Sequence, residues 1–384
     1  MPRAGAERLR LDRRIIERLL HLHWGFVLLI CLPVAVGCVM LYSAAGGSFD
    51  PWASRQLIRF GIGGTLMLVV ALVDIRFWMR AAYTIYGIAF MLLVGVEIMG
   101  DIGKGAQRWI DVGIVQLQPS ELMKIALVLA LARYFHGLDL EQIRRPSYII
   151  VPVLMTLLPA GLVLKQPDLG TAVLLLLGGV VILYLAGIRL WLLGLGAAAL
   201  IGALPVAWQF LHDYQKQRVM TFLDPESDPL GAGYHILQSK IALGSGGLTG
   251  KGFLQGSQSY LNFLPEKQTD FIFTMLAEEF GLVGSICLLL LYALIIAAGL
   301  LVALRARHQF GRLLAFGVAT TFFFYVFINV AMVTGLVPVV GVPLPLISYG
   351  GSAMLTLMAG FGLILNVHIF RDLQIGRRPE SARP

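Results

Sequence analysis

Long apolar runs recur along the chain and are separated by short polar connections. A helix needs about 20 mostly apolar residues to cross the hydrocarbon core of a bilayer, because backbone groups left unpaired in lipid are costly. Ten runs meet this requirement, and the eighth is long enough to project beyond the bilayer. They lie at 24–42, 57–73, 81–97, 118–135, 147–163, 170–186, 190–210, 271–304, 311–336 and 348–370. The pattern predicts an all-α polytopic membrane protein with ten transmembrane helices.

One connection is much longer than the others. Residues 211–270 form a polar, Gly-rich segment of 60 residues between the seventh and eighth runs. Loops of this length in compact proteins are usually functional or disordered. Its aromatic and aliphatic residues, and the amphipathic stretch YHILQSKIAL, indicate an ordered lid. We therefore expect an amino-terminal tail (1–23), one ten-helix domain (24–370) with this large loop, and a carboxyl-terminal tail (371–384).

Composition and charge define the class and the orientation. The chain is 58% hydrophobic and 14% charged, against about 45–50% and 25% for soluble proteins, which excludes a soluble enzyme. If the amino terminus lies inside, 19 of the 30 Lys and Arg residues fall on the inner side, giving net charges of +11 inside and −3 outside. Because Lys and Arg are retained in the cytoplasm, both termini are expected there. The basic charge therefore requires no nucleic-acid partner, and the three cysteines, all in apolar runs, imply neither disulfides nor a metal site.

The few ionisable groups near the membrane gather at outer helix ends. Glu121 and Lys124 open the fourth run, three residues apart and so on one helix face. Asp168 precedes the sixth run and Asp270 the eighth. Each charge at membrane depth costs about 2.5–3.5 kcal/mol on insertion scales, so each needs a partner or a water-filled cavity. We expect a polar cluster at the outer mouth of the bundle, beneath the long loop.

Structural explanations compete with functional ones for these side chains. Ser120, Asp168 and Asp270 are of the residue types that cap helix starts. Glu121 and Lys124 could form a surface ion pair worth only a few tenths of a kcal/mol.

Three further features have simple explanations. Glu278 and Glu279 could be a solvated outer rim, and Trp109 an aromatic anchor at the membrane interface. The stretch GSGGLTGKG is similar to a phosphate loop but lacks the spacing G-x-x-x-x-G-K-[ST], so it predicts no nucleotide site.

A carboxylate among cations on the outer side suits chemistry on a lipid diphosphate. Transfer of a sugar from a polyprenyl diphosphate needs a base for the acceptor hydroxyl and positive charge for the departing diphosphate. One carboxylate therefore suffices for an inverting transfer. The outer cations are Lys104, Arg108, Lys124, Lys165, Arg218, Lys240, Lys251 and Lys267. A divalent cation (Mg or Mn) could accompany the diphosphate, although no residue pattern specifies one.

Six motifs in a fixed order carry a family resemblance. They are GAQRWIDVG with QPSELMK, KQPDLGTA, QRVMTFLDP, DPLGAGYHILQSKIALGSGGLTGKGF, LPEKQTDFIFTMLAEEFG and PLPLISYGGS. Over nearly its whole length the chain resembles the SEDS (shape, elongation, division, sporulation) family, and within it the RodA, or rod shape-determining, branch. The resemblance implies a peptidoglycan glycosyltransferase that polymerises lipid II during cell elongation and rod-shape maintenance. It also implies the bacterial cytoplasmic (inner) membrane, an active site facing the periplasm, and as partners a class B penicillin-binding protein and other rod-complex membrane proteins.

The resemblance assigns roles to particular residues. The family's essential aspartate matches Asp270, which we expect to be the general base. Its Arg-Trp pair matches Arg108 and Trp109, and other polar positions match Glu121 and Lys124. We expect Arg108 and Lys124 to hold the diphosphate or Asp270, Glu121 to position Lys124, and Trp109 to pack on a sugar or the isoprenoid.

Two more residues complete the expected substrate-binding set. Asp168 matches another polar position of the family, and Arg218 lies in the motif QRVMTFLDP. Gln268 departs from the family pattern, which often has a His there.

The sequence also leaves different functions open. Ten spans with charged groups also describe carriers, so the chain could be a lipid II flippase. A flippase predicts charges near mid-bilayer in broken helices, whereas these charges lie at outer helix ends and no internal repeat is evident. A scaffold that only activates the penicillin-binding protein would also fit the spans, as would a polymerase of the FtsW-like division branch.

Overall fold

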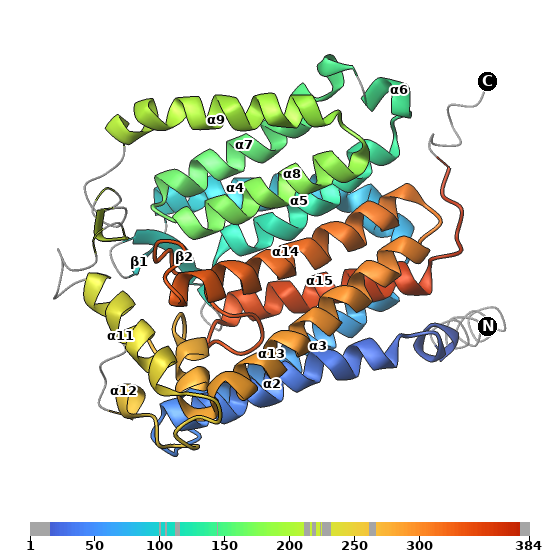
Figure 1. Cartoon of the computed structure of the whole chain (residues 1–384). Helices are drawn as coiled ribbons and strands as arrows, with labels where there is room; N and C mark the ends of the chain where they lie inside the picture. Colours follow the sequence, from blue (N-terminus) through green and yellow to red (C-terminus); the bar gives the residue numbers. More distant parts are fainter. Residues whose placement is uncertain are drawn as a thin grey trace, which may run out of the picture.

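The computed structural model describes residues 16–99, 101–103, 106–111, 116–143, 145–210, 216, 220–222, 224, 232–260 and 266–376. Within these ranges, ten long helices lie side by side in one bundle (Figure 1). They are α2 (Trp24–Ala44), α3 (Trp52–Leu72), α4 (Ile75–Met99), α5 (Pro119–His136), α7 (Ile150–Lys165), α8 (Leu169–Ala186), α9 (Leu190–Phe210), α13 (Ile272–Arg305), α14 (Gln309–Val333) and α15 (Gly351–Ile369).

These ten helices coincide with the ten predicted spans, so the predicted fold class is confirmed. Eight of them are long and apolar enough to cross a membrane by length and composition. The other two are α5, which carries three charged residues, and α9, whose apolar part is Leu190–Ala203. Helices α3 and α4 begin five or six residues earlier than predicted, because their first turns contain arginines that lower the local hydropathy.

A small antiparallel sheet joins α4 to α5, and the sequence did not predict it. Its strands are β1 (Asp101–Gly103), β2 (Ala106–Asp111) and β3 (Gln116–Leu117), in the order β1-β2-β3. The sheet lies at the same end of the bundle as the short helices α11 (Ala232–Ser245) and α12 (Ser257–Tyr260) (Figure 1). The stretch YHILQSKIAL is helical as predicted and lies within α11. The short elements α6 (Leu140–Ile143) and η1 (Pro146–Tyr148) join α5 to α7 at the other end.

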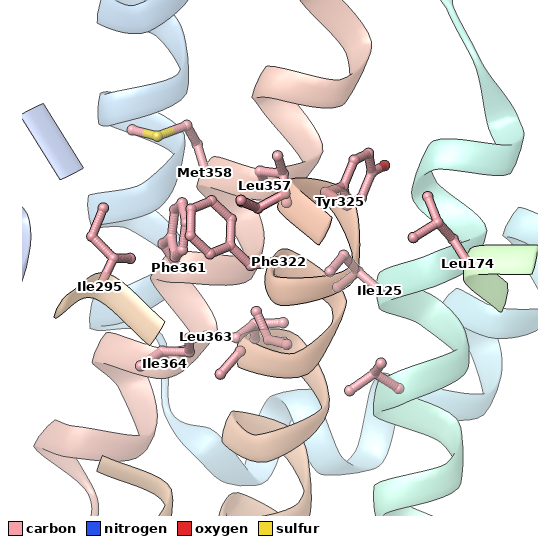
Figure 2. Close-up of a cluster of buried hydrophobic side chains, with 14 of the residues drawn as sticks. Ile125, Leu174, Ile295, Phe322, Tyr325, Leu357, Met358, Phe361, Leu363 and Ile364 are labelled. Carbon is pink, nitrogen blue, oxygen red and sulfur yellow. The ribbon is translucent and has the colours of Figure 1, made fainter. Parts of the chain in front are cut away.

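The core of the bundle forms around α5, α14 and α15. Aromatic rings pack edge to face there, with the centroids of Phe322 and Phe361 5.1 Å apart (Figure 2). The α14 helix packs against α5, α8, α13 and α15. Its polar residues Tyr325 and Asn329 are therefore buried, with 1% and 0% of their surfaces exposed.

Helix α13 is broken near its amino-terminal end. Gly281 has φ 66° and ψ −160°, which interrupts the helix. The whole helix has 34 residues, or about 51 Å at 1.5 Å per residue. Residues 282–305 alone span about 36 Å, enough for a roughly 30 Å hydrocarbon core. The part of α13 after the break is therefore long enough to cross a membrane by itself.

A Gly-rich loop, residues 246–252, fills this break. Its backbone forms hydrogen bonds with main-chain carbonyl and N–H groups on the two sides of Gly281. In a continuous helix these groups would bond to each other. Four backbone hydrogen bonds connect the two segments: Leu282 N to Gly247 O (3.0 Å), Val283 N to Leu248 O (3.1 Å), Lys251 N to Glu278 O (3.0 Å) and Gly252 N to Glu279 O (3.0 Å).

The close approach of the two backbones explains the glycines of GSGGLTGKG. A Cβ on Gly246 would lie 2.0 Å from the Ala277 carbonyl oxygen, and a Cβ on Gly250 would lie 2.1 Å from that of Glu279. Gly250 also has φ 82°, a conformation that costs other residues about 1–2 kcal/mol. This stretch serves as a clasp on a broken helix.

Candidate active site

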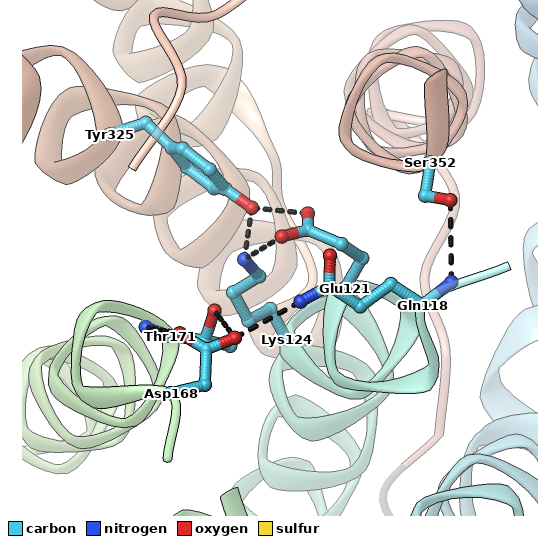
Figure 3. Close-up of polar contacts among 7 residues, drawn as sticks. All are labelled: Gln118, Glu121, Lys124, Asp168, Thr171, Tyr325 and Ser352. Atoms are coloured by element: carbon cyan, nitrogen blue, oxygen red, sulfur yellow. Dashed lines mark hydrogen bonds and ion pairs between the residues drawn. The ribbon is translucent and has the colours of Figure 1, made fainter. Parts of the chain in front are cut away.

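Three polar side chains from α5 and α14 form a buried cluster (Figure 3). Lys124 Nζ donates to Glu121 Oε1 at 2.7 Å and also to the Tyr325 hydroxyl, which in turn donates to Glu121 Oε2. Glu121 and Lys124 are each only 3% exposed. The pair is therefore a buried ion pair, in which removal of one partner leaves an uncompensated charge. Sequence reasoning found Glu121 and Lys124 but missed Tyr325, whose contact spans 201 residues of sequence.

Asp168 lies beside this cluster and caps α8. Its Oδ1 accepts from Thr171 N at 3.1 Å and its Oδ2 accepts from Thr171 Oγ1 at 2.9 Å. The capping explanation is correct for this residue. Asp168 Oδ2 also accepts from Gln118 Nε2 at 3.0 Å, which links the start of α8 to the start of α5. The carboxylate therefore has both a structural role and a position next to the buried pair.

A serine at the start of α15 connects this helix to the same group. Ser352 Oγ donates to the Gln116 carbonyl at 2.7 Å and accepts from Gln118 N at 3.3 Å. The starts of α5, α8 and α15 thus meet at one point (Figure 3).

Asp270 lies in the turn before α13 and does not cap that helix. The N-cap is Phe271, and no side chain caps it. Ser120 does not cap α5 either, because Gln118 occupies the N-cap position. Asn329 Nδ2 donates to the Asp270 carbonyl at 3.0 Å and to the Val342 carbonyl at 2.7 Å. The capping explanation is wrong for Ser120 and Asp270.

The segment before α15 holds the Asp270 turn in place. Ser348 Oγ donates to the Thr269 carbonyl at 2.5 Å, and Tyr349 N donates to the Gln268 carbonyl at 2.8 Å. A Cβ on Gly341 would lie 3.5 Å from Asp270 Oδ2, so this segment also borders the carboxylate. Gln268 contributes its backbone carbonyl to this contact, which a His at the same position could equally supply.

Helix α14 connects the Asp270 turn to the buried cluster. Asn329 follows Tyr325 by four residues, about 6 Å along the helix axis. Asn329 binds the backbone of Asp270, and Tyr325 binds Glu121 and Lys124. Adjacent turns of α14 therefore hold the predicted base, Asp270, and the buried Glu121–Lys124 pair.

Arg108 and Trp109 lie on β2, and Arg108 contacts the turn that precedes α8. Arg108 Nε donates to the Gln166 carbonyl at 3.0 Å, and its Nη2 donates to the Pro167 carbonyl. The guanidinium thus holds the turn that precedes Asp168. Both Arg108 and Trp109 are half-buried. Arg218, the remaining predicted site residue, lies outside the described residues.

Glu278 and Glu279 are buried, so their interpretation as a solvated rim is wrong. They are 0% and 2% exposed. Glu278 Oε1 accepts from Lys251 Nζ at 2.7 Å, and Glu279 Oε1 accepts from Ser43 Oγ. The clasp loop thus pairs with the Glu278 carboxylate, whereas the Glu279 carboxylate lies against α2. Sequence could not show this because the helix break was not predicted.

A polar cavity of about 390 Å³ lies next to Glu279, between the α2–α3 turn and the segment that leads to Asp270. It is lined by Asp50, Lys267 and Glu279 among others. Burial lowers the pKa of Lys267. Across the described ranges, no group of three or more His, Cys, Asp or Glu side chains could hold a metal ion.

The chain matches known proteins along almost its whole length. The sequence profile of the FtsW, RodA and SpoVE family, described as "Cell cycle protein", matches residues 23–373. The chain is 49% identical over 350 residues to the Peptidoglycan glycosyltransferase MrdB of Escherichia coli K12, covering 90% of this chain and 94% of that relative.

Solved structures show the same fold. One, described as "Structural coordination of polymerization and crosslinking by a peptidoglycan synthase complex", contains a chain with TM-score 0.78 and 37% identity, covering 91% of this chain and 98% of that one. The rod shape determining protein RodA of Thermus thermophilus gives TM-score 0.69 and 33% identity, covering 92% and 98%.

Proposed function

The chain belongs to the FtsW, RodA and SpoVE family, and we propose that it is a peptidoglycan glycosyltransferase of the RodA branch. It would polymerise lipid II into β-1,4 glycan strands during cell elongation. The similarity to MrdB supports this activity. The observation that carries the proposal is the position of Asp270, held by α14 one turn from a buried Glu-Lys-Tyr cluster.

In the proposed mechanism, Asp270 acts as the general base. It accepts the proton of the acceptor 4-hydroxyl, whose oxygen attacks the anomeric carbon of the donor glycan. The bond to the diphosphate breaks and the diphosphate leaves as an anion, so the α-linked donor gives a β-1,4 product with inversion. The reaction needs only one carboxylate, because the leaving group requires no protonation.

Within the buried ion pair, Lys124 would supply a fixed ammonium donor near the reaction. Lys124 uses two of its three N–H groups for Glu121 and Tyr325, which fixes its position before substrate binds. A preorganised charge of this kind stabilises developing negative charge without reorganisation during the reaction. Arg108 would act indirectly, by holding the turn before Asp168.

We also propose that the protein lies in the bacterial cytoplasmic (inner) membrane with both termini inside, and that it works with a partner protein. The arginine excess supports a cytoplasmic position for both termini, so the ends carrying Asp270 and the clasp loop would face the periplasm. A class B penicillin-binding protein is the proposed partner, because a similar chain belongs to a synthase complex that coordinates polymerization and crosslinking.

The test is polymerisation of lipid II by the purified full-length protein in detergent, with and without the partner and with a chelator arm. Asp270→Asn should lower the rate by at least about 100-fold, the usual effect of losing a general base. Glu97→Gln, which removes a partly exposed ion pair with Lys165, is the matched control.

The same assay distinguishes a polymerase from a flippase and from a scaffold. Glycan polymer formed in detergent, where no second compartment exists, excludes a flippase without polymerase activity. Loss of polymer in Asp270→Asn with partner binding retained excludes a pure scaffold. Wild-type polymerisation by folded Asp270→Asn protein would show that the assignment of the base is wrong.

A further inference from the structure

A second polar cavity lies at the end of the bundle opposite to Asp270. Its volume is about 370 Å³, within the range of about 300–1,000 Å³ found for small-ligand sites. It is formed by the end of α5, the start of α14 and the segment after α15. The lining residues are His136, Arg307, His308, Gln309, Arg312, Gln374 and Ile375.

The cavity lies at the level of lipid headgroups. Leu304 is a 65% exposed apolar side chain, and Arg305 ends α13 directly after it. The change from an exposed apolar side chain to Arg305 and Arg307 is expected at the boundary of the hydrocarbon core. This is also the side with the arginine excess, which attracts anionic lipids in general.

Two arginines give the cavity positive charge that remains accessible. Arg307 Nε contacts Asp372 Oδ1 at 3.3 Å, but both side chains are about two-thirds exposed, and such pairs contribute little. Arg312 is exposed and has no ion-pair partner in the part of the chain that the structure describes. Sorting of arginines to one side of the membrane does not by itself explain why both line one cavity.

A buried histidine lines the same cavity. His308 is 4% exposed, and its Nδ1 accepts from Gly311 N at 2.8 Å. The proton of the neutral ring must therefore be on Nε2, a buried atom near the Phe370 carbonyl. Burial lowers the pKa of His308 to about 4 and the nearby His136 acts in the same direction, whereas the Phe370 carbonyl opposes them. At neutral pH the ring is an uncharged donor.

The start of α14 adds to this arrangement. The helix has 25 residues, and the positive end of its dipole favours anions. A phosphate group bound here would meet two guanidinium groups and a helix start.

We infer that this cavity binds the phosphate group of an anionic phospholipid from the inner leaflet. A phosphodiester headgroup carries the single negative charge and the acceptor oxygens that these groups require. The position at headgroup level favours a lipid over a soluble phosphate.

The test measures lipids retained by the purified full-length protein, using native mass spectrometry in detergent. Phosphatidylglycerol should be retained in preference to phosphatidylcholine. Arg312→Gln and Arg307→Gln should each lower retention about fivefold, as expected for one cation near a charged lipid. Arg189→Gln, an exposed arginine on the same side that does not line the cavity, should have no effect.

A variant with the opposite effect tests the role of Arg307 independently of folding. Asp372→Asn removes the competing carboxylate and should raise retention about two- to fivefold.

The outcomes separate the two sources of phosphate. Inorganic phosphate that competes with phosphatidylglycerol at equal concentration would support a phosphate site but assign a soluble ligand. No competition would support the lipid. Equal retention of phosphatidylcholine, or wild-type retention of phosphatidylglycerol in Arg312→Gln and Arg307→Gln, would overturn the inference.

Discussion

The clasp on the broken helix predicts a large effect from one added methyl group. In Gly250→Ala the new Cβ would lie 2.1 Å from the Glu279 carbonyl oxygen, at φ 82°. The left-handed backbone alone costs about 1–2 kcal/mol. If the loop moves away to relieve the clash, the bonds from Lys251 N and Gly252 N to the Glu278 and Glu279 carbonyls are lost, and unpaired buried carbonyls cost about 1–3 kcal/mol each. We expect a loss of about 3–8 kcal/mol.

Two neighbouring glycines provide graded controls for this prediction. Gly247 has φ 55° but open space around its Cβ position, so Gly247→Ala should cost only the backbone term of about 1–2 kcal/mol. Gly244 lies in α11 with open space and no positive φ, so Gly244→Ala should be neutral or stabilise the protein by up to about 1 kcal/mol.

The assay is thermal denaturation of the purified protein in detergent, followed by intrinsic fluorescence. A loss of about 3–8 kcal/mol should lower Tm by at least about 3 °C, since each kcal/mol corresponds to one or a few degrees in a chain of this size. If Gly250→Ala and Gly244→Ala denature at the same temperature, the clasp does not stabilise the broken helix.

Three further predictions concern other groups. Tyr325→Phe leaves Glu121 and Lys124 without their shared hydroxyl and should destabilise the protein by about 1.5–3 kcal/mol, with an unchanged Tm in detergent as the contrary result. The pKa of His308 is about 4 in the folded state and about 6.5 in the unfolded state, so the unfolded state binds more protons between these pH values and stability falls as pH falls. The wild type should lose about 2–3 kcal/mol of stability from pH 7 to 4.5 through this group. The variant His308→Asn should show a correspondingly smaller change in Tm over the same range. Asp168→Asn keeps a capping oxygen whereas Asp168→Ala does not, so only the alanine variant should lose about 1 kcal/mol of stability. Equal Tm values for the two variants would argue against the cap. Loss of polymerisation in a stable asparagine variant would show that the negative charge is needed for function.

The ten spans could be predicted from sequence because crossing a bilayer requires a long apolar helix, and little else in the chain satisfies that requirement. The predicted helix starts and the connection between α4 and α5 were less accurate. Helices α3 and α4 begin in turns that contain arginines, which hydropathy assigned to the connections. The three-stranded sheet was missed because its strands have only two to six residues, too few to show an alternating pattern.

The candidate site could be predicted only in part. Glu121, Lys124 and Asp168 were found because charges near a membrane are rare, and the structure brings them together. Tyr325 was missed because an aromatic residue in an apolar run gives no signal of its polar contacts. The catalytic role of Asp270 and the substrate-binding roles of the other residues stay predictions, since no bound substrate tests them.

Glu278 and Glu279 show a different limit. Two adjacent carboxylates normally indicate a solvated surface, and their burial depends on a loop about 30 residues earlier in the chain. That contact follows from the break at Gly281, which no local pattern predicted.

The backbone nature of the clasp has a consequence for how its sequence can change. The four backbone hydrogen bonds between the loop and α13 join main-chain atoms, so they do not depend on which side chains the loop carries; the Lys251–Glu278 ion pair is the side-chain contact that does. Positions such as Leu248 and Thr249 can therefore accept many substitutions without altering the join, whereas Gly246, Gly250 and Gly281 cannot. The segment therefore contains positions that tolerate substitution within a few residues of positions that do not. A library of single variants should show this as a large difference in stability between neighbouring positions.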